Sequence, residues 1–274
     1  GFAGDTLNTA VYLKRSAPAL EVSFVTRLGH CGFSARMVDF IAAEGLETGD
    51  ITFSETAHIG LYAITTDAAG ERSFTYWRDN SAARQMFQSD KSISFAPLEK
   101  YDVIYLSAIT LAILPEPVRL ELYKFLTGFR TNGGRVAFDS NYRTVLWPDL
   151  TTARQNIARM WELCDLALPS VDDEMAAFGD TAEVDVIARL QSLGVADGAL
   201  KRGPLGPVSL GVPVQASYAA APRVVDTTAA GDSFNGGYLG ARLAGAGQAV
   251  ALQAGHDLAS RVVGIKGAIV PQVT

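Results

Sequence analysis

The chain has 274 residues, of which 48% are hydrophobic and 19% charged, and a formal net charge of −6. This composition predicts one large folded domain, with or without a small appendage, and excludes an intrinsically disordered chain. Lys and Arg do not cluster, so nothing predicts a nucleic-acid-binding or lipid-binding surface. No apolar run approaches the roughly 20 residues that span a bilayer. We therefore expect no nucleic-acid and no membrane partner. Cys31 and Cys164 lack metal-ligand spacing and indicate reduced thiols, which favours a cytoplasmic protein.

Short β-rich runs alternate with segments of helical period along most of the chain. The predicted strands are 21–29, 102–107, 135–141, 165–170 and 198–203. The predicted helices are 34–45, 117–134, 152–164 and 184–194. Gly45 stands where a C-terminal cap glycine belongs. Apolar strands that alternate with helices favour an α/β fold whose mostly parallel sheet is covered on both faces.

Residues 56–80 interrupt this alternation and predict two strands around a turn at 67–70. An ordinary edge hairpin is one interpretation. Tyr62, Tyr76 and Arg78 lie in these strands, and their side chains favour a lid over a binding site.

The stretch VVDTTAAGDSFNGGYLGARL, residues 224–243, leaves a strand and enters a helix. Small residues let the backbone approach a ligand, and the free N–H groups of the first helical turn attract an anion such as phosphate. Asp232 lies at this helix start. It is either a capping residue or a general base that accepts a proton from an alcohol. No GxxxxGK[ST] motif occurs, so a kinase with this sequence is not of the P-loop type.

Other polar residues close predicted strands. Asp139 and Asn141 end the strand 135–141, at the sheet edge where open α/β sheets bind their ligands. A simple turn is the alternative interpretation.

Residues 226–239, DTTAAGDSFNGGYL, resemble the C-terminal signature of the ribokinase-like (PfkB) family of sugar kinases, whose usual form is DTxGAGD. GDTLN (4–8), YWR (76–78) and NYRTVLW (141–147) resemble the branch of that family that phosphorylates 2-keto-3-deoxygluconate. The resemblance implies a three-layer α-β-α ribokinase-like fold with a small β lid. Residues 1–55 and 80–274 would form the core and 56–79 the lid.

The resemblance also implies ATP-dependent phosphorylation of the sugar acid at its terminal hydroxyl, with Mg²⁺, by a homodimer or higher homo-oligomer. Asp232 would be the catalytic base, and the backbone N–H groups of Ala229, Ala230 and Gly231 would form the anion hole. The residues implied in substrate binding are Ala3, Gly4, Asp5, Tyr62, Tyr76, Arg78 and Arg143. The residues implied in ATP binding are Asn141, Arg143, Lys201, Gly203 and Gly206.

The sequence departs from the family pattern in several places. Ala3 and Ala229 stand where glycine is usual. The family's NxxE motif corresponds to SVDDE, residues 170–174, so Asp173 or Glu174 would support Mg²⁺, acting through water. The family's first strand, which would precede residue 1, is missing, and Gly203 begins a segment that is short for the family.

Three alternatives to this kinase follow from the same residues. A related kinase of fructose, ribose or another keto-deoxy sugar acid would share Asp232, but a neutral sugar has no use for paired arginines. A non-catalytic sugar-acid sensor would bind without turnover. A plain nucleotide-binding scaffold would use Asp232 only structurally.

Overall fold

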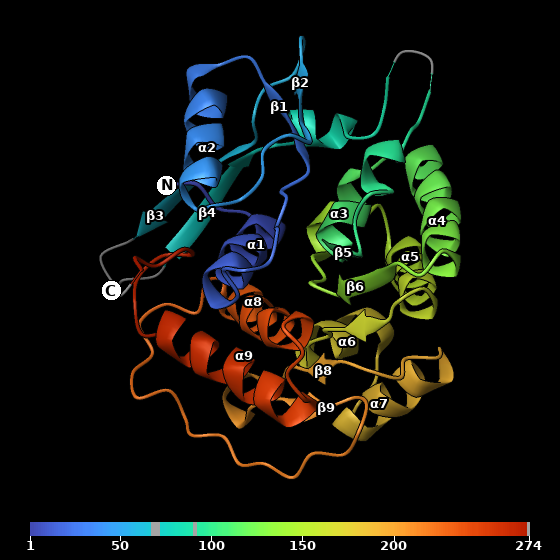
Figure 1. Cartoon of the computed structure of the whole chain (residues 1–274), viewed down its shortest axis with the longest axis vertical. Coiled ribbons are helices and arrows are strands. Elements are labelled where there is room, and N and C mark those ends of the chain that lie inside the picture. The colour runs from blue at the N-terminus through green and yellow to red at the C-terminus, as the bar shows by residue number, and fades with distance from the viewer. Residues whose placement is uncertain (67–71, 90–91, 273–274) are drawn as a thin grey trace.

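The structure is a computed structural model that describes residues 1–66, 72–89 and 92–272 (Figure 1). Its helices are α1 (Asp5–Ser16), α2 (Gly32–Ala43), α3 (Ala108–Ile113), α4 (Glu116–Thr131), α5 (Leu150–Glu162), α6 (Val171–Phe178), α7 (Glu183–Ser192), α8 (Ala230–Leu243) and α9 (Gln248–Val262). Its strands are β1 (Thr26–Gly29), β2 (Ile51–Ser54), β3 (Leu61–Thr66), β4 (Arg72–Trp77), β5 (Val103–Ser107), β6 (Arg135–Asp139), β7 (Leu166–Ala167), β8 (Ala199–Leu200) and β9 (Val208–Ser209).

The centre of the molecule is a parallel sheet in the order β5-β6-β7. Isolated parallel bridges from Ala167 to Gly198 and from Ser170 to Lys201 extend it towards β8. A second parallel pair, β1 with β2, is covered by α2. The predicted parallel α/β sheet is therefore confirmed.

Alternate side chains of β6 enter two different cores. Val136 and Phe138 pack in one cluster with Leu126 of α4 and Ile157 of α5. Ala137 belongs to a second cluster with Tyr238 of α8. Because successive side chains of a strand point to opposite faces, helices cover the sheet on both sides, as three layers require. In Figure 1, α8 and α9 lie on the side of the sheet opposite to α4 and α5.

Several predicted elements are shorter than their sequence patterns. The strand expected over 21–29 narrows to β1, and Ser23 keeps only an isolated parallel bridge to Glu47. The helix expected over 34–45 begins earlier and ends as predicted, since Gly45 takes a left-handed φ of 76°. Glycine adopts this conformation without the steric cost that a side chain would add.

The predicted hairpin is present as β3 paired antiparallel with β4. Tyr62 lies opposite Tyr76, and Leu61 lies opposite Trp77. The predicted turn at 67–70 falls outside the described residues. In Figure 1 the hairpin lies to one side of the molecule, near α2. Its assignment as a separate lid stays a prediction.

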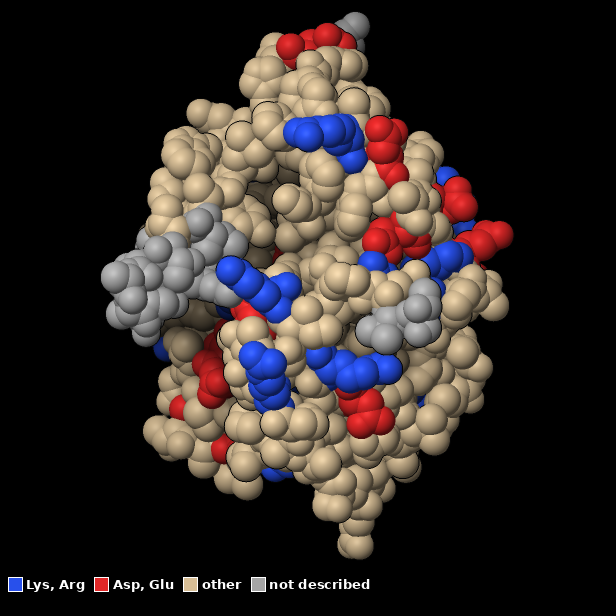
Figure 2. All heavy atoms as spheres, turned by 90° about the vertical axis from the view of Figure 1, so that its left-hand side faces the viewer, with Lys and Arg blue, Asp and Glu red and all other residues tan. Residues whose placement is uncertain are grey.

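The surface carries mixed charge on the face that Figure 2 shows. Basic and acidic side chains are interspersed there among many uncharged ones, and a hollow opens among uncharged residues above the middle of this face. None of the helices in the described parts of the chain has both the length and the apolar character to cross a membrane.

Candidate active site

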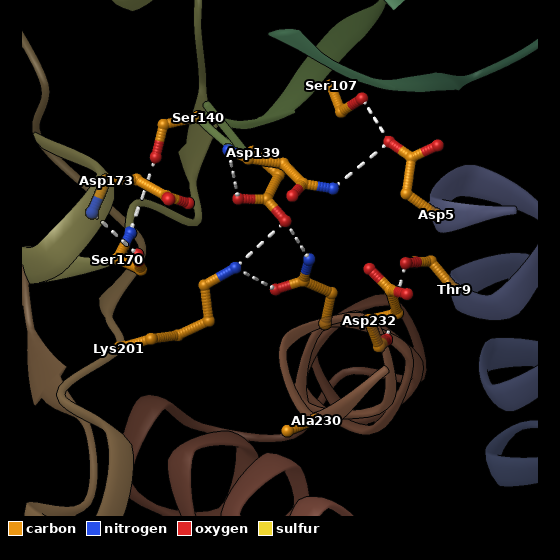
Figure 3. A network of polar contacts seen from close by, with 12 residues as sticks. Asp5, Thr9, Ser107, Asp139, Ser140, Ser170, Asp173, Lys201, Ala230 and Asp232 are labelled. Atoms are coloured by element: carbon orange, nitrogen blue, oxygen red, sulfur yellow. Dashed lines mark hydrogen bonds and ion pairs between the residues drawn. The ribbon is translucent and has the colours of Figure 1, made fainter. Parts of the chain in front are cut away.

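Polar side chains from four elements meet at one edge of the central sheet (Figure 3). Ser107 and Asp139 are the last residues of β5 and β6. Asp5 begins α1, and Asp232 lies in the first turn of α8. The carboxyl ends of parallel strands are where open α/β folds bind ligands, so the topology itself brings these groups together.

Asp232 is not a helix cap. No side chain caps α8, and the carboxylate of Asp232 instead accepts a hydrogen bond from Asn8 of α1, with Nδ2 to Oδ2 at 2.8 Å. The pKa of Asp232 is raised to about 8, mainly by burial and then by the charges of Asp5 and Asp139, while the hydrogen bond from Asn8 and the charge of Lys201 oppose the shift. A buried carboxyl whose pKa lies near neutrality is typical of a general base.

The start of α8 presents unpaired backbone donors beside this carboxyl. Within the described chain, no residue accepts a hydrogen bond from the N–H groups of Ala229, Gly231 or Asp232, whereas Ala230 N donates to Thr227 O at 3.2 Å. The helix dipole adds partial positive charge at the same point. These groups can hold an anion. The turn requires Ala229 to adopt φ 60° and ψ 19°, a left-handed conformation that favours glycine.

Asp5 faces the site from α1. Its Oδ2 accepts hydrogen bonds from Ser107 Oγ and, at 3.2 Å, from Asn141 Nδ2. Burial raises the pKa of Asp5, and the negative charge of Asp139 adds to this upward shift. Asn141 has a φ of 23°, and its backbone N donates to Asp139 Oδ1 at 3.1 Å. The structure thus places Asn141 against the residue predicted to bind sugar; its predicted contact with ATP stays a prediction.

Lys201 and Asp139 form a buried ion pair with Asn235 between them. Lys201 Nζ lies 2.9 Å from Asp139 Oδ2 and 3.1 Å from Asn235 Oδ1. Asn235 Nδ2 also donates to Asp139 Oδ2 at 2.6 Å. A Cβ atom added to Gly231 would lie 3.6 Å from Lys201 Nζ, so the ammonium group borders the first turn of α8. The cation balances part of the negative charge of the site.

The remaining glycines predicted for ATP binding form a turn after Lys201. Gly203 and Gly206 have φ of 57° and 76°. A side chain at position 206 would collide with the ring of Tyr218, whose Cδ2 would lie 2.4 Å from the added Cβ. Glycine is therefore required at position 206 for both conformation and space.

The two candidates for metal support point in different directions. Asp173 faces the site, and its Oδ1 lies 3.4 Å from Arg143 Nη1. Burial raises the pKa of Asp173, and the charge of Asp139 adds to the effect. Glu174 is fully buried and pairs instead with Arg189 of α7 at 3.0 Å. Burial raises the pKa of Glu174 to about 7. Asp173 is therefore the carboxyl that a bound metal could reach.

The residues predicted to lie in the lid form a group of their own. The ring centroids of Tyr62 and Tyr76 lie 6.2 Å apart, and the Arg78 guanidinium stacks 4.1 Å from the centroid of Tyr76. Near the N-terminus, Gly4 N donates to Asn8 Oδ1 at 3.3 Å, and Ala3 is half-buried beside it. Gly4 is thereby tied to the residue that holds Asp232.

Sequence reasoning missed four polar residues of this site: Asn8, Tyr105, Ser107 and Asn235. Local signals existed for two of them. Asn235 follows Asp232 by three positions and therefore lies on the same helix face, and Ser107 closes a predicted strand. Asn8 and Tyr105 gave no local signal, since their partners are distant in the chain.

A family profile described as "pfkB family carbohydrate kinase" matches residues 1–274. The chain belongs to the pfkB family of carbohydrate kinases. This pfkB kinase is 42% identical over 280 residues to 2-dehydro-3-deoxygluconokinase of Escherichia coli K12. The aligned region covers 99% of this chain and 91% of that protein. It is also 42% identical over 281 residues to the enzyme of the same name from Dickeya dadantii, covering 99% and 90%. Fructokinase-1 of Zea mays is 27% identical over 241 residues, covering 86% and 72%.

Solved structures share the fold of this pfkB kinase. The crystal structure of a PfkB protein from Polaromonas has a TM-score of 0.82 at 25% identity and covers 95% of this chain and 85% of that one. A putative ribokinase II from E. coli, solved in complex with ATP and Mg²⁺, has a TM-score of 0.84 at 22% identity and covers 97% and 84%. The predicted ribokinase-like fold is confirmed.

Proposed function

We propose that this chain transfers the γ-phosphoryl group of ATP to the terminal hydroxyl of 2-dehydro-3-deoxygluconate, the sugar acid also called 2-keto-3-deoxygluconate. The product is 2-keto-3-deoxy-6-phosphogluconate. The substrate assignment rests on the 42% identity, over 99% of the chain, to kinases named for this acid. Relatives named fructokinase are only 27% identical, which favours the acid over the neutral sugar.

Asp232 would act as the general base. The hydroxyl oxygen attacks the γ-phosphorus in line, the bond from that phosphorus to the bridging oxygen of ADP breaks, and the hydroxyl proton passes to Asp232. The pKa of about 8 at Asp232 matches a group that must accept a proton near neutral pH. The geometry supports this assignment because the carboxylate lies beside the free N–H groups of the same helix turn.

The start of α8 and Lys201 would stabilise the charge on the transferred group. The N–H groups of Ala229 and Gly231 have no acceptor among the described residues, and the ammonium group of Lys201 borders Gly231. Lysine has three N–H donors, and Asp139 and Asn235 take two, so one is left for a phosphoryl oxygen. We propose that Lys201 binds the transferred phosphoryl group and that the turn of Gly203 and Gly206 lines the nucleotide-binding side of the site.

The donor set fits Mg²⁺. The described residues contain no group of three or more possible ligands, and magnesium usually takes one or two carboxylates together with water and substrate phosphates. Asp173 would hold the ion, through water, because it faces the site whereas Glu174 is paired with Arg189. When bound with ATP, the ion would supply charge neutralisation on the phosphates.

Substrate recognition would be divided between core and lid. Asp5 and the backbone of Gly4, with Ala3 beside them, would bind sugar hydroxyls. Tyr62 and Tyr76 would close over the sugar from the hairpin. Arg78 and Arg143 are the candidates for the substrate carboxylate, since a guanidinium pairs with a carboxylate in a bidentate manner.

The assay that tests this function measures ADP release with Mg-ATP and a panel of sugars and sugar acids. We expect kcat/KM for 2-dehydro-3-deoxygluconate to exceed that for fructose and ribose by at least about a hundredfold. Arg78→Ala should raise KM for the acid without the same effect on a neutral sugar. Faster turnover of a neutral sugar would overturn the substrate assignment, and binding without turnover would favour a sugar-acid sensor.

We also propose that the hairpin mediates a homodimer. Leu61 and Trp77 face each other across the two strands, and these residues are 43% and 61% exposed. Successive residues point to opposite faces, so this apolar pair lies on the face away from Tyr62 and Tyr76. Exposed apolar pairs of this kind favour a protein contact. Light scattering should show a dimer at micromolar concentration, and a monomer would contradict the proposal.

A cytoplasmic location is the final part of the proposal. Cys31 and Cys164 are free thiols. Free thiols are typical of proteins from reducing compartments. Fractionation of the source cells would test the location.

A further inference from the structure

Asn8 makes two hydrogen bonds that join the sugar-binding end of α1 to the catalytic turn of α8. Its Nδ2 donates to Asp232 Oδ2 at 2.8 Å. Its Oδ1 accepts from Gly4 N at 3.3 Å. Because the backbone N–H of Gly4 can only donate, the oxygen end of the amide must face Gly4 and the NH₂ end must face Asp232. The orientation of the amide is therefore determined by the chain itself.

The contact is buried. Asn8 is only 4% exposed, so its side chain cannot exchange this contact for water without moving α1. The two helices approach closely because α8 has glycine opposite α1. A Cβ atom on Gly236 would lie 2.5 Å from Tyr12 Cβ and 2.8 Å from Leu13 N. This close approach brings the short side chain of Asn8 within reach of Asp232.

The hydrogen bond occupies one oxygen of the base and leaves the other available. In the described parts of the chain, Asp232 Oδ1 receives no hydrogen bond, whereas Oδ2 is held by Asn8. A carboxylate held at one oxygen cannot rotate freely about its Cβ–Cγ bond. Oδ1 is then the atom presented to an incoming hydroxyl.

We propose that Asn8 is the positioning residue of the catalytic base: it fixes the plane of the Asp232 carboxylate and directs Oδ1 towards the substrate hydroxyl. The inference rests on the proposed kinase function of Asp232. It also connects substrate binding to chemistry, because Gly4, which holds the amide of Asn8, belongs to the segment that would bind the sugar.

The test compares Asn8→Leu with a matched control, Tyr12→Phe. Leucine has nearly the shape of asparagine but cannot donate to Asp232. Tyr12 lies one turn further along α1, is 1% exposed, and donates its hydroxyl to Ala268 O at 2.8 Å rather than to Asp232. Both variants lose a buried polar contact of α1, but only the first loses the contact to the base.

The kinetic readout is kcat, KM and the pH profile of kcat with 2-dehydro-3-deoxygluconate. Asn8→Leu should lower kcat about tenfold to a hundredfold with KM within about threefold of the wild type. The acidic limb of the kcat profile of Asn8→Leu should lie about one pH unit higher than that of the wild type, because leucine cannot donate the hydrogen bond that stabilises the ionised carboxylate of Asp232. Tyr12→Phe should keep the wild-type limb. An unchanged kcat in Asn8→Leu, or a loss with an unmoved limb, would overturn the proposal.

A second measurement separates this inference from the proposed function. The carboxyl ¹³C resonance of Asp232, assigned with Asp232→Asn, is titrated in the wild type and in Asn8→Leu. If the wild type phosphorylates no sugar, the proposed function fails, and this titration still decides whether Asn8 controls the carboxyl. If Asn8→Leu does not fold, Asn8→Asp retains the shape and the acceptor for Gly4, and should shift the Asp232 titration upward. An unshifted resonance would refute the role of Asn8.

Discussion

The ammonium group of Lys201 lies 2.9 Å from Asp139 Oδ2, and both side chains are almost completely buried. The pair joins the last residue of β6 to the residue that directly follows β8. Asn235 bonds to both partners, so the charges are enclosed in a hydrogen-bonded triad. Buried charges are stable only when they are paired and hydrogen-bonded in this way.

Lys201→Met should destabilise the protein strongly because it leaves Asp139 buried without its cation. Breaking a buried pair costs about 3–5 kcal/mol in the free energy of unfolding. The double variant Lys201→Met/Asp139→Asn should recover most of that loss while phosphoryl transfer stays impaired. Urea unfolding measures the stability of the single and the double variant, and ADP release measures their phosphoryl transfer. A single variant as stable as the wild type would show that the pair is not required for stability.

The pH dependence of kcat/KM should have an acidic limb near pH 8. The base must be ionised to accept a proton, and the pKa of Asp232 is raised to about 8, so the active fraction falls as pH decreases through that value. Initial rates between pH 6 and 9.5 at subsaturating sugar acid measure the limb. A limb near pH 4, the ordinary value for aspartate, would mean that another group accepts the proton.

Asp232→Asn should abolish turnover and raise stability. Loss of the base is expected to lower kcat by about 10³-fold or more, with ATP binding retained. A carboxyl whose pKa is raised on folding opposes folding when it ionises, and this cost grows as pH rises through its folded value. Removing the charge should therefore raise the melting temperature most at alkaline pH. Calorimetry at pH 6 and pH 9 compares the two conditions, and normal turnover would refute the assignment of the base.

Ala229→Gly should be neutral or stabilise the fold by up to about 1 kcal/mol. The substitution relieves a left-handed alanine, a strain of roughly 1–2 kcal/mol, but it also increases the entropy of the unfolded chain. Ala241→Gly, in the interior of α8, is the matched control and should lose about 1 kcal/mol. Chemical denaturation distinguishes them. Equal losses for the two variants would argue against strain at Ala229.

Asp173→Asn should change the Mg²⁺ requirement of the reaction, whereas Glu174→Gln should change the stability of the fold. Asp173 faces the site, so its variant should require more Mg²⁺ for half-maximal rate, with unfolding free energy changed by less than about 1 kcal/mol. Glu174 is buried against Arg189, so its variant should lose stability while the Mg²⁺ requirement stays unchanged. Magnesium titration of the rate and thermal unfolding test the pair. A shifted Mg²⁺ requirement in Glu174→Gln would reverse the assignment.

Features that depend on near neighbours in the chain were predictable. The alternation of apolar strands and helices predicted the covered parallel sheet, and Gly45 predicted the end of α2. The run of small residues before Asp232 predicted the helix start, where the N–H groups of Ala229 and Gly231 have no acceptor among the described residues. The strand over 21–29 was predicted too long, because the β pattern there does not reveal where pairing with β2 ends.

Contacts between distant segments were not predictable. Asn8 and Asp232 are 224 positions apart, and nothing in either segment indicates the other. Lys201 was expected to bind ATP, but its ion pair with Asp139 was not foreseen, since it depends on the parallel bridge from Ser170 to Lys201 that brings this residue to the sheet edge. Asp173 and Glu174 are adjacent and chemically alike, and only the packing of α6 against α7 directs one to the site and the other to Arg189.

The sequence by itself determined the fold class, the family and the helix start that carries Asp232, because periodicity and motif spacing are properties of contiguous residues. The tertiary structure decided which polar groups meet Asp232, which carboxyl faces the site, and how far the pKa of the base is raised. Those properties depend on burial and on charges from α1, β6 and α8, which come together only when the chain has folded.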